Sequence, residues 1–546
     1  MTQVGEPADV LTGVVPFPAE AAAAYRAAGY WTGEPLGTIL DRWVATDPDR
    51  VAVVAGPQRI TYGQLDRRAT EFAAGLQTLG LRAGDRAVVQ LPNLPDLLVT
   101  LIAMFRVGVL PVLALPAHRR NEIGYLCAHS QARAYVVVDA APRFDYRELA
   151  AQVRAEHPTI EHVIVAGDPG GFRSIDEVVA LGAGRQVVPP EQPVPVAFFL
   201  LSGGTTGLPK LIPRTHDDYR YQLRETAAAM GFDQSGVYLA ALPAAHNAAL
   251  GCPGVLGALL AGGRVVLAAS PSPDEVGPLI AAERVTLTTL MPSFLTLWAD
   301  LADLFDTDLS GLTIEVGGAR LSPEDALSAE RALGATVSRW FGMAEGVLSF
   351  TRADDPDDVR LGTEGRPMSP ADEMMIVSVD TDQPLPSGET GALLVRGPCT
   401  LRGYYDAADY NARSFTTDGF LRTGDLARFT PAGHLVIAGR IKDIVNRAGE
   451  KVPVEEVEGF LVRHPAVADV AVVALPDHAL GERTCAVVVP RGPAPTLPDL
   501  RTFLAAHDLA DYKFPDQIVI VDALPRTSLG KPDKVTLTTQ LATSPR

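Results

Sequence analysis

Apolar residues in the first four hundred or so positions gather in short runs, which alternate with longer stretches of helical periodicity. The runs are rich in β-branched residues and have the length of buried strands: VAVVAG (51–56), RAVVQL (86–91), AYVVVD (134–139), HVIVAG (162–167), VAFFLLS (196–202), RVVLAAS (264–270) and TLTTLM (286–291). Apolar strands separated by helical stretches are typical of parallel sheets with helices on both faces. The pattern therefore predicts an α/β fold.

One predicted helix has a recognisable start and end. Thr61 precedes YGQLDRRATEFAAGLQTLG, in which apolar residues recur at helical spacing from Leu65 to Leu76. Threonine is a favoured N-cap, and Gly80 stands where a helix C-cap belongs. We expect one continuous helix between Thr61 and Gly80.

The pattern changes after about residue 370. EMMIVSVD, GALLVRG and GHLVIAG are short, bounded by glycine, and indicate a meander or small barrel. Beyond Lys442, two apolar runs and two helical stretches form a unit of about one hundred residues, which is the size of a small domain. We predict a core over residues 1–438, a hinge at 439–443 and a C-terminal domain over 444–546.

Charge and composition narrow the class of protein. The net charge of −18 repels phosphate backbones and anionic lipid, so we expect neither nucleic acid nor a membrane as partner. The four cysteines form no CxxC pair, which argues against zinc and disulfides and for a reduced, cytoplasmic setting. The N-terminus lacks the features of a signal peptide, and the apolar stretch 97–116 is interrupted by Arg106, Gly108 and Pro111.

A loop rich in glycine and threonine follows the apolar strand at 196–202, within LLSGGTTGLPKLIPRTH (200–216). Glycine exposes backbone N–H groups and tolerates positive φ, so such a loop can wrap an anion. Its spacing differs from that of a Walker A loop, G-x-x-x-x-G-K-[ST]. We predict that these residues bind phosphate: Ser202, Gly203, Gly204, Thr205, Thr206, Gly207 and Lys210.

The segment SGGTTGLPK resembles the signature loop of the acyl-adenylate-forming superfamily. Further motifs of that family follow in order: FGMAEG (341–346), LRTGD (421–425), GRIKDIVNRAGEKV (439–452) and PRTSLGKPDK (525–534). The resemblance implies a large N-terminal domain of two helix-covered sheets plus a small barrel. A small, mobile α+β C-terminal domain follows. It also implies that the protein uses ATP to convert a carboxylic acid into its acyl-adenylate.

The resemblance assigns roles to single residues. Glu345 would bind Mg²⁺, Asp425 the ribose hydroxyls together with Arg440, and Lys531 would bridge the carboxylate and the α-phosphate. Lys442 occupies the hinge position, and Gly449 lies on the face presented to a pantetheine thiol. The remaining ATP-binding residues implied are Gly317, Gly318, Ala319, Gly342, Met343 and Ala344.

The segment AAHNAALGCPGVLG (244–257) resembles the aryl-acid ligases of siderophore pathways, as do residues 14–31 and 214–221. Asn247 would hydrogen-bond the ortho-hydroxyl or carboxylate of the acid. His246, taken with Lys531 as catalytic, would line the wall between the acid and the α-phosphate. Gly318 would also contact the acid.

Two positions discriminate between acids. Relatives that use 2,3-dihydroxybenzoate resemble one another in having serine where Cys252 stands and valine where Leu348 stands. A thiol is a weak partner for a 3-hydroxyl, so we expect salicylate, with 2,3-dihydroxybenzoate as the alternative. Where relatives carry an aromatic residue, this chain has Ala248 and then Ala249, so a substituted salicylate such as a 6-methyl derivative is expected to fit.

The acyl acceptor is predicted to be a phosphopantetheine thiol on an aryl carrier protein. No carrier motif is recognised in the tail LATSPR, so a separate carrier protein is expected. Free coenzyme A is an alternative acceptor. A non-enzymatic nucleotide-binding protein is a third hypothesis, against which the presence of Glu345, Asp425 and Lys531 argues. The resemblance of residues 244–257 to aryl-acid ligases argues against a luciferase-type oxidation.

Overall fold

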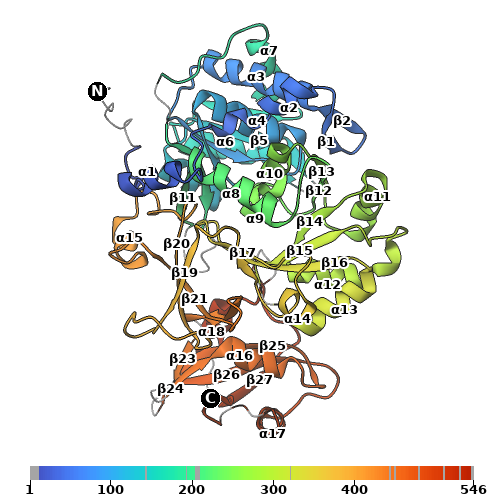
Figure 1. Cartoon of the computed structure of the whole chain (residues 1–546), viewed down its shortest axis with the longest axis vertical. Coiled ribbons are helices and arrows are strands. Elements are labelled where there is room, and N and C mark those ends of the chain that lie inside the picture. The colour runs from blue at the N-terminus through green and yellow to red at the C-terminus, as the bar shows by residue number, and fades with distance from the viewer. Residues whose placement is uncertain are drawn as a thin grey trace. The chain divides into compact units, whose positions relative to one another are not determined.

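The computed structural model describes residues 11–141, 144–191, 194–202, 209–319, 321–441, 444–447, 450–477, 480–507, 509, 511–527 and 531–542 (Figure 1). The chain divides into two compact units. The first unit comprises the chain up to Leu361, with Pro367–Glu373 and Arg396–Leu421. The second unit comprises Gly362–Arg366, Met374–Val395 and the chain from Arg422 onward.

Two large sheets organise the first unit. One runs in the order β11-β10-β4-β3-β5-β8-β9 and is parallel except for β11. Its strands are β3 (Arg86–Gln90), β4 (Leu110–Leu113), β5 (Ala134–Val138), β8 (His162–Ala166), β9 (Arg173–Ser174), β10 (Val196–Leu201) and β11 (Leu211–Thr215). The other contains β17-β16-β15-β14-β12-β13-β1-β2. These are β1 (Val51–Ala55), β2 (Gln58–Thr61), β12 (Val237–Ala240), β13 (Arg264–Leu267), β14 (Leu287–Leu290), β15 (Thr313–Gly317), β16 (Thr336–Gly342) and β17 (Leu348–Phe350).

Helices connect the parallel strands, as parallel pairing requires, and further helices lie before β1 and after β17. They are α1 (Ala19–Ala27), α2 (Asp41–Thr46), α3 (Tyr62–Thr78), α4 (Pro95–Val107), α5 (Arg120–Ser130), α6 (Tyr146–Glu156), α7 (Ile175–Gly182), α8 (His216–Ala229), α9 (Asn247–Gly251), α10 (Gly254–Ala261), α11 (Pro273–Glu283), α12 (Pro292–Asp300), α13 (Pro323–Leu333), α14 (Asp357–Arg360) and α15 (Ala408–Ser414). The predicted helix after Thr61 is confirmed as α3, and the Thr61 side chain accepts a hydrogen bond from the Gln64 N–H in a capping box.

Strand β15 has two unlike faces. Ile314 and Val316 pack into an apolar cluster with Trp298 of α12 and Ala326 of α13, and Figure 1 shows these helices beside β15 and β16. Because side chains alternate along a strand, Glu315 and Gly317 face the opposite side. There Glu315 lies in register with Thr289 of β14 and Ser338 of β16. A carboxyl group is therefore placed on a buried face of the sheet.

The second unit contains two smaller sheets. One has the order β19-β20-β21-β22, and the other β24-β23-β26-β25 with β27 paired to β26. The elements are β19 (Glu373–Val377), β20 (Gly391–Arg396), β21 (Leu421–Phe429), β22 (Leu435–Arg440), β23 (Ile444–Arg447), β24 (Glu450–Pro453), α16 (Val454–Leu461), β25 (Val467–Asp477), β26 (Gly481–Pro490), α17 (Leu497–Ala505), β27 (Gln517–Ile520) and α18 (Lys534–Ala542). The predicted α/β fold is confirmed. Among the described helices, none is long and apolar enough to cross a bilayer.

Candidate active site

The base of the predicted phosphate loop is closed by two hydrogen bonds. The Ser202 N–H donates to the Lys210 carbonyl at 2.9 Å, and the Lys210 N–H donates to Ser202 Oγ at 3.0 Å. Residues 203–208 between them lie outside the described residues, so the roles assigned to Gly203, Gly204, Thr205, Thr206 and Gly207 stay predictions. The sequence folds this way locally because β10 and β11 form an antiparallel pair that brings Ser202 next to Lys210.

The Lys210 ammonium lies over an aromatic ring of the first unit. Its Nζ is 3.9 Å from the ring centroid of Tyr410 in α15. An ammonium over an aromatic face is attracted by the quadrupole of the ring. Lys210 is therefore positioned at the base of the loop as a fixed cation, the property that a phosphate-binding role needs.

Glu345 lies in the turn between β16 and β17 and is only 5% exposed. Its Oε1 accepts a hydrogen bond from the Tyr404 hydroxyl at 2.8 Å, and its backbone carbonyl accepts from the Leu401 N–H at 2.9 Å. Burial and then the Glu345 carboxylate raise the pKa of Tyr404, so Tyr404 stays a donor. Gly342, Met343 and Ala344 lead into the same turn, and the Met343 N–H donates to the Val347 carbonyl at 3.0 Å.

Arg214, near the end of β11, donates a hydrogen bond to the backbone of this turn. It is fully buried and donates to the Ala344 carbonyl at 2.9 Å, to Asp218 Oδ1 at 2.9 Å and to Gln222 Oε1 at 3.0 Å. Arg214 was not predicted from the sequence. The signal available was an arginine four residues before Asp218, in the first turn of α8, which is too common a pattern to identify a buried pair.

The predicted acid-binding residues come together in the first unit. Ala248, Cys252, Trp340 and Leu348 pack in one apolar cluster, which we call the acid-binding cluster. Burial raises the pKa of the Cys252 thiol to about 12, so the thiol stays protonated. Cys252 and Leu348, the two positions expected to discriminate between acids, thus lie in one packed group, and their role in acid selection stays a prediction.

Asn247 and His246 stand at the start of α9, beside that cluster. Asn247 is 8% exposed, and its Oδ1 accepts from the Tyr219 hydroxyl at 3.0 Å. Its amide nitrogen donates to Cys252 Sγ at 3.8 Å, which leaves the second amide hydrogen as the donor that can meet a substrate oxygen. His246 Nδ1 accepts from the Ala248 N–H at 3.3 Å and so caps the helix.

The glycine turn after β15 is shaped by contact with Trp340. A Cβ on Gly317 would lie 2.5 Å from the Trp340 ring, and one on Gly318, where φ is +78°, would lie 2.7 Å from Met291 Sδ. Side chains larger than hydrogen are therefore excluded at both positions. Ala319 is exposed, as expected of a residue that could lie against a nucleotide.

Glu315 was not predicted from the sequence. It is 2% exposed, and its Oε2 is buried without a hydrogen-bond partner. Burial raises the pKa of Glu315 to about 8 against the opposing effect of the Arg352 charge, so this carboxyl is mostly neutral at pH 7. The Glu315 carboxyl in turn contributes to the raised pKa of Cys252.

Glu315→Gln is expected to stabilise the protein by an amount that grows with pH. The folded state keeps a proton that the unfolded chain releases above pH 4.5, so the stability contributed by the carboxyl is complete below that pH and is lost up to about pH 8. The difference in unfolding free energy across this window is on the order of 4 kcal/mol. Thermal melting of both proteins from pH 5 to pH 8 should show a widening gap in Tm; a constant gap contradicts the assignment.

Asp425 and Arg440 form a pair in the second unit. They lie in register on β21 and β22, with Arg440 Nε 3.0 Å from Asp425 Oδ1. Asp425 is 2% exposed and its Oδ2 has no hydrogen-bond partner. Burial raises the pKa of Asp425, while Arg440 and, more weakly, Lys531 lower it. The unpaired Oδ2 fits a role in accepting hydroxyl hydrogens.

Lys531 follows three residues that lie outside the described part of the chain. Its N–H donates to Thr527 Oγ1 at 3.3 Å, and its carbonyl accepts from the Thr527 N–H at 2.8 Å. Its charge acts on Asp425 within the second unit, so the predicted catalytic lysine and a predicted ATP-binding residue lie within electrostatic range of one another. The hinge residue Lys442 and Gly449 fall outside the described residues and stay predictions.

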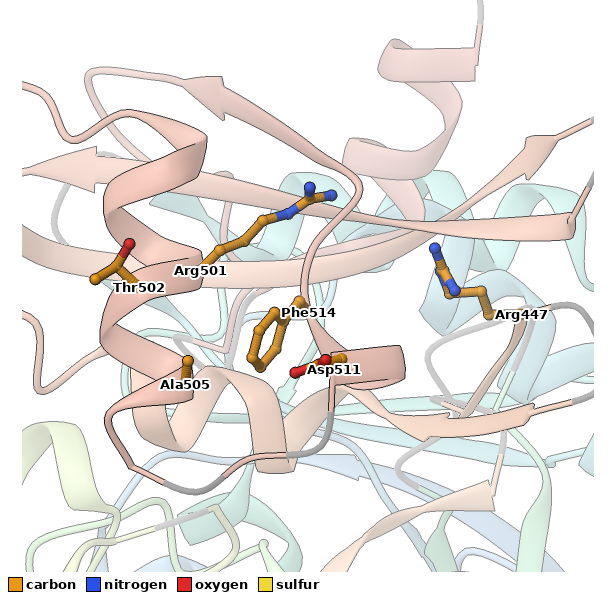
Figure 2. Close-up of a pocket in the computed structure, with 6 residues that line it drawn as sticks. All are labelled: Arg447, Arg501, Thr502, Ala505, Asp511 and Phe514. Carbon is orange, nitrogen blue, oxygen red and sulfur yellow. The ribbon is translucent and has the colours of Figure 1, made fainter.

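The second unit also has a hollow beside α17. It is lined by Arg447, Arg501, Thr502, Ala505, Asp511 and Phe514 (Figure 2). Arg501 donates to the Pro515 carbonyl at 2.8 Å, and Arg447 pairs with Asp516 at 2.7 Å. Both guanidinium groups already have protein partners, and none of the predicted site residues lines the hollow.

Comparison with known proteins identifies strong similarities. Residues 40–405 match the AMP-binding enzyme family, and residues 456–531 match the C-terminal domain of AMP-binding enzymes. Triostin synthetase I of Streptomyces triostinicus is 51% identical (98% of this chain, 100% of that protein). The 2,3-dihydroxybenzoate-AMP ligase of Bacillus subtilis is 49% identical (97% of each).

A salicyl-AMP ligase / salicyl-S-ArCP synthetase of Mycobacterium tuberculosis is 46% identical, over 98% of this chain and 96% of that protein. Among solved structures, apo MbtA of Mycobacterium smegmatis is similar with a TM-score of 0.75 and 44% identity, over 97% of this chain and 99% of that chain. The two family matches therefore fall in both units and include Ser202, Lys210, Glu345 and Lys531.

Proposed function

The chain belongs to the AMP-binding enzyme family, and we propose that it is an aryl acid–AMP ligase acting on salicylate or a substituted salicylate. The observation that carries this proposal is the packing of Cys252 and Leu348 in one buried cluster beside Asn247. An amide donor next to an apolar wall suits a flat aromatic acid with an ortho-hydroxyl. Relatives named for salicylate and for 2,3-dihydroxybenzoate support the same class.

In the proposed first step, a carboxylate oxygen of the acid attacks the α-phosphorus of ATP. The new bond joins that oxygen to phosphorus while the bond to the bridging oxygen breaks, which releases pyrophosphate. Lys531 neutralises the charge that grows on the reacting oxygens, and Asp425 with Arg440 holds the ribose. Lys210 and the N–H groups of its loop hold the phosphates that leave.

Mg²⁺ is part of the proposal, with Glu345 as its protein ligand. Among the described residues there is no group of three or more His, Cys, Asp or Glu side chains that could hold a metal alone. A single buried carboxylate fits Mg²⁺, which commonly takes one or two carboxylates plus substrate phosphates. When bound there, the ion would reduce the negative charge of the triphosphate.

The proposed second step transfers the aryl group to the phosphopantetheine thiol of a separate aryl carrier protein. The thiol sulfur attacks the carbonyl carbon of the aryl-adenylate, a thioester forms, and AMP leaves. Movement about a hinge at 439–443 would withdraw Lys531 and present Gly449. The boundaries 1–438 and 444–546 belong to this proposal, as does a cytoplasmic location, which the four free cysteines favour.

ATP–pyrophosphate exchange tests the proposal. Salicylate and 2,3-dihydroxybenzoate are each compared with benzoate, which lacks the ortho-hydroxyl. We expect exchange with the hydroxylated acids to exceed that with benzoate by about tenfold or more, because the Asn247 amide would lose its partner. Equal exchange with benzoate contradicts the role of Asn247. Thioester formation on holo-carrier and on coenzyme A, measured side by side, decides the acceptor.

A further inference from the structure

One buried carboxyl of the first unit takes no part in the reaction proposed above. Glu315 stands in the middle of β15, whose neighbours Ile314 and Val316 fill the apolar core on the other face. A carboxyl group buried without a partner costs stability, and an apolar side chain of similar size would avoid that cost. The presence of a carboxyl at position 315 therefore indicates a role in binding a ligand rather than a structural role.

The polar neighbours of Glu315 on the sheet are already paired with one another. The Tyr238 hydroxyl donates to Thr289 Oγ1 at 3.2 Å, and Ser338 Oγ and Thr351 Oγ1 are 3.1 Å apart. Neither pair includes the Oε2 of Glu315, which stays unpaired. A second unpaired polar group lies on the same face of the sheet, because the Trp340 indole N–H is buried and also has no hydrogen-bond partner.

This face of the sheet leads to the acid-binding cluster. Trp340, a member of the cluster, lies in register with Gly317, two residues after Glu315 and on the same face. The Glu315 carboxyl also interacts electrostatically with Cys252, another member. Two unpaired polar atoms thus stand next to the residues proposed to surround the edge of the aromatic ring.

We propose, on the basis of the adenylation function above, that Glu315 recognises a hydroxyl or amino group at ring position 3 of a salicylate. Cys252 alone disfavours a 3-hydroxyl, because a thiol is a weak partner. Glu315 supplies the partner that the thiol does not, since its Oε2 accepts the hydrogen of such a group. The preferred acid is then a salicylate with a hydrogen-bond donor next to the ortho-hydroxyl, such as 2,3-dihydroxybenzoate or 3-aminosalicylate, rather than the unsubstituted salicylate that Cys252 and Leu348 alone would favour.

Four acids test this inference: salicylate and its 3-hydroxy (2,3-dihydroxybenzoate), 3-amino and 3-methyl derivatives, of which the last three have substituents of nearly equal size. ATP–pyrophosphate exchange gives kcat/KM for each with the full chain and with Glu315→Leu and Glu315→Gln. We expect the full chain to prefer the 3-hydroxy or 3-amino acid over the 3-methyl acid by about tenfold or more. Glu315→Leu should abolish this preference, and Glu315→Gln, which keeps a carbonyl acceptor, should retain most of it.

Glu283→Gln is a matched control. Glu283 is another nearly buried glutamate, but it ends α11 and is paired with Arg264 at 3.0 Å and with Arg59. Its replacement should leave the ratio between 3-hydroxy and 3-methyl acids unchanged. If Glu315→Leu does not fold, the ratio of kcat/KM between the 3-hydroxy and 3-methyl acids, measured with the full chain and with Glu315→Gln, still tests the inference.

The inference is overturned if the full chain uses the 3-methyl acid as well as the 3-hydroxy and 3-amino acids, or if Glu315→Leu keeps the preference. Either result leaves the proposed function intact as long as salicylate supports exchange. Absence of exchange with all four acids would instead contradict the proposed function, so the two failures are distinguishable.

Discussion

Lys531→Ala is expected to lower the rate of aryl-adenylate formation by about 10²- to 10³-fold. The reason is that negative charge grows between the attacking carboxylate and the α-phosphate, and Lys531 is the cation proposed to meet it. Thioester formation from a supplied aryl-adenylate should change by less than about threefold, because Lys531 has no part in that step. Exchange of pyrophosphate and single-turnover thioester formation measure the two steps separately.

Lys534→Ala is the control for this variant. Lys534 starts α18, three residues after Lys531, and its Nζ is 2.8 Å from Glu458 Oε1. Its replacement removes a cation from the same segment, so any loss of activity that it shares with Lys531→Ala reflects stability. The assignment of Lys531 is wrong if both steps slow equally in Lys531→Ala, or if neither does.

Glu345→Gln is expected to lower exchange by about a hundredfold and to raise the Mg²⁺ concentration needed for half-maximal rate. The amide keeps the shape of the side chain and can still accept from Tyr404, but it lacks the charge that a hard cation requires. Titration of exchange with MgCl₂ at saturating ATP and acid gives both quantities.

Tyr404→Phe distinguishes the effect of the Glu345 charge from the effect of the position of its side chain. It removes the hydroxyl that donates to Glu345 Oε1 and keeps the carboxylate, so the loss should be smaller, about tenfold, with little change in the Mg²⁺ requirement. A Glu345→Gln enzyme that turns over slowly but needs no more Mg²⁺ than the full chain would show that Glu345 is not a metal ligand.

Much of the fold follows from local patterns. β-Branched runs such as 134–139 and 162–167 became the parallel strands β5 and β8, because a strand covered on both faces has to be apolar throughout. The capping of α3 was equally predictable, since Thr61 and Gln64 interact over one turn. In both cases the signal lies within a few residues.

The acid-binding cluster depends on tertiary structure. Cys252 and Leu348 are far apart in sequence, and only the resemblance to aryl-acid ligases predicted that they would act together. Glu315 was missed for the same reason. In TIEVG it reads as a polar residue on a solvated face, and its burial depends on elements that cover this face of the sheet. Arg214 was missed likewise, because its partner Ala344 comes from a remote loop.

The central claim is that the carboxylate of the acid attacks the α-phosphorus of ATP. Following a labelled carboxylate oxygen into the products tests this claim most directly. Salicylate labelled with ¹⁸O in its carboxylate is incubated with the enzyme, ATP, Mg²⁺ and a thiol acceptor, and the products are analysed by mass spectrometry. Attack on the α-phosphorus predicts one ¹⁸O atom in the AMP released and none in inorganic phosphate. Label in inorganic phosphate together with ADP would mean attack on the γ-phosphorus and would contradict adenylation.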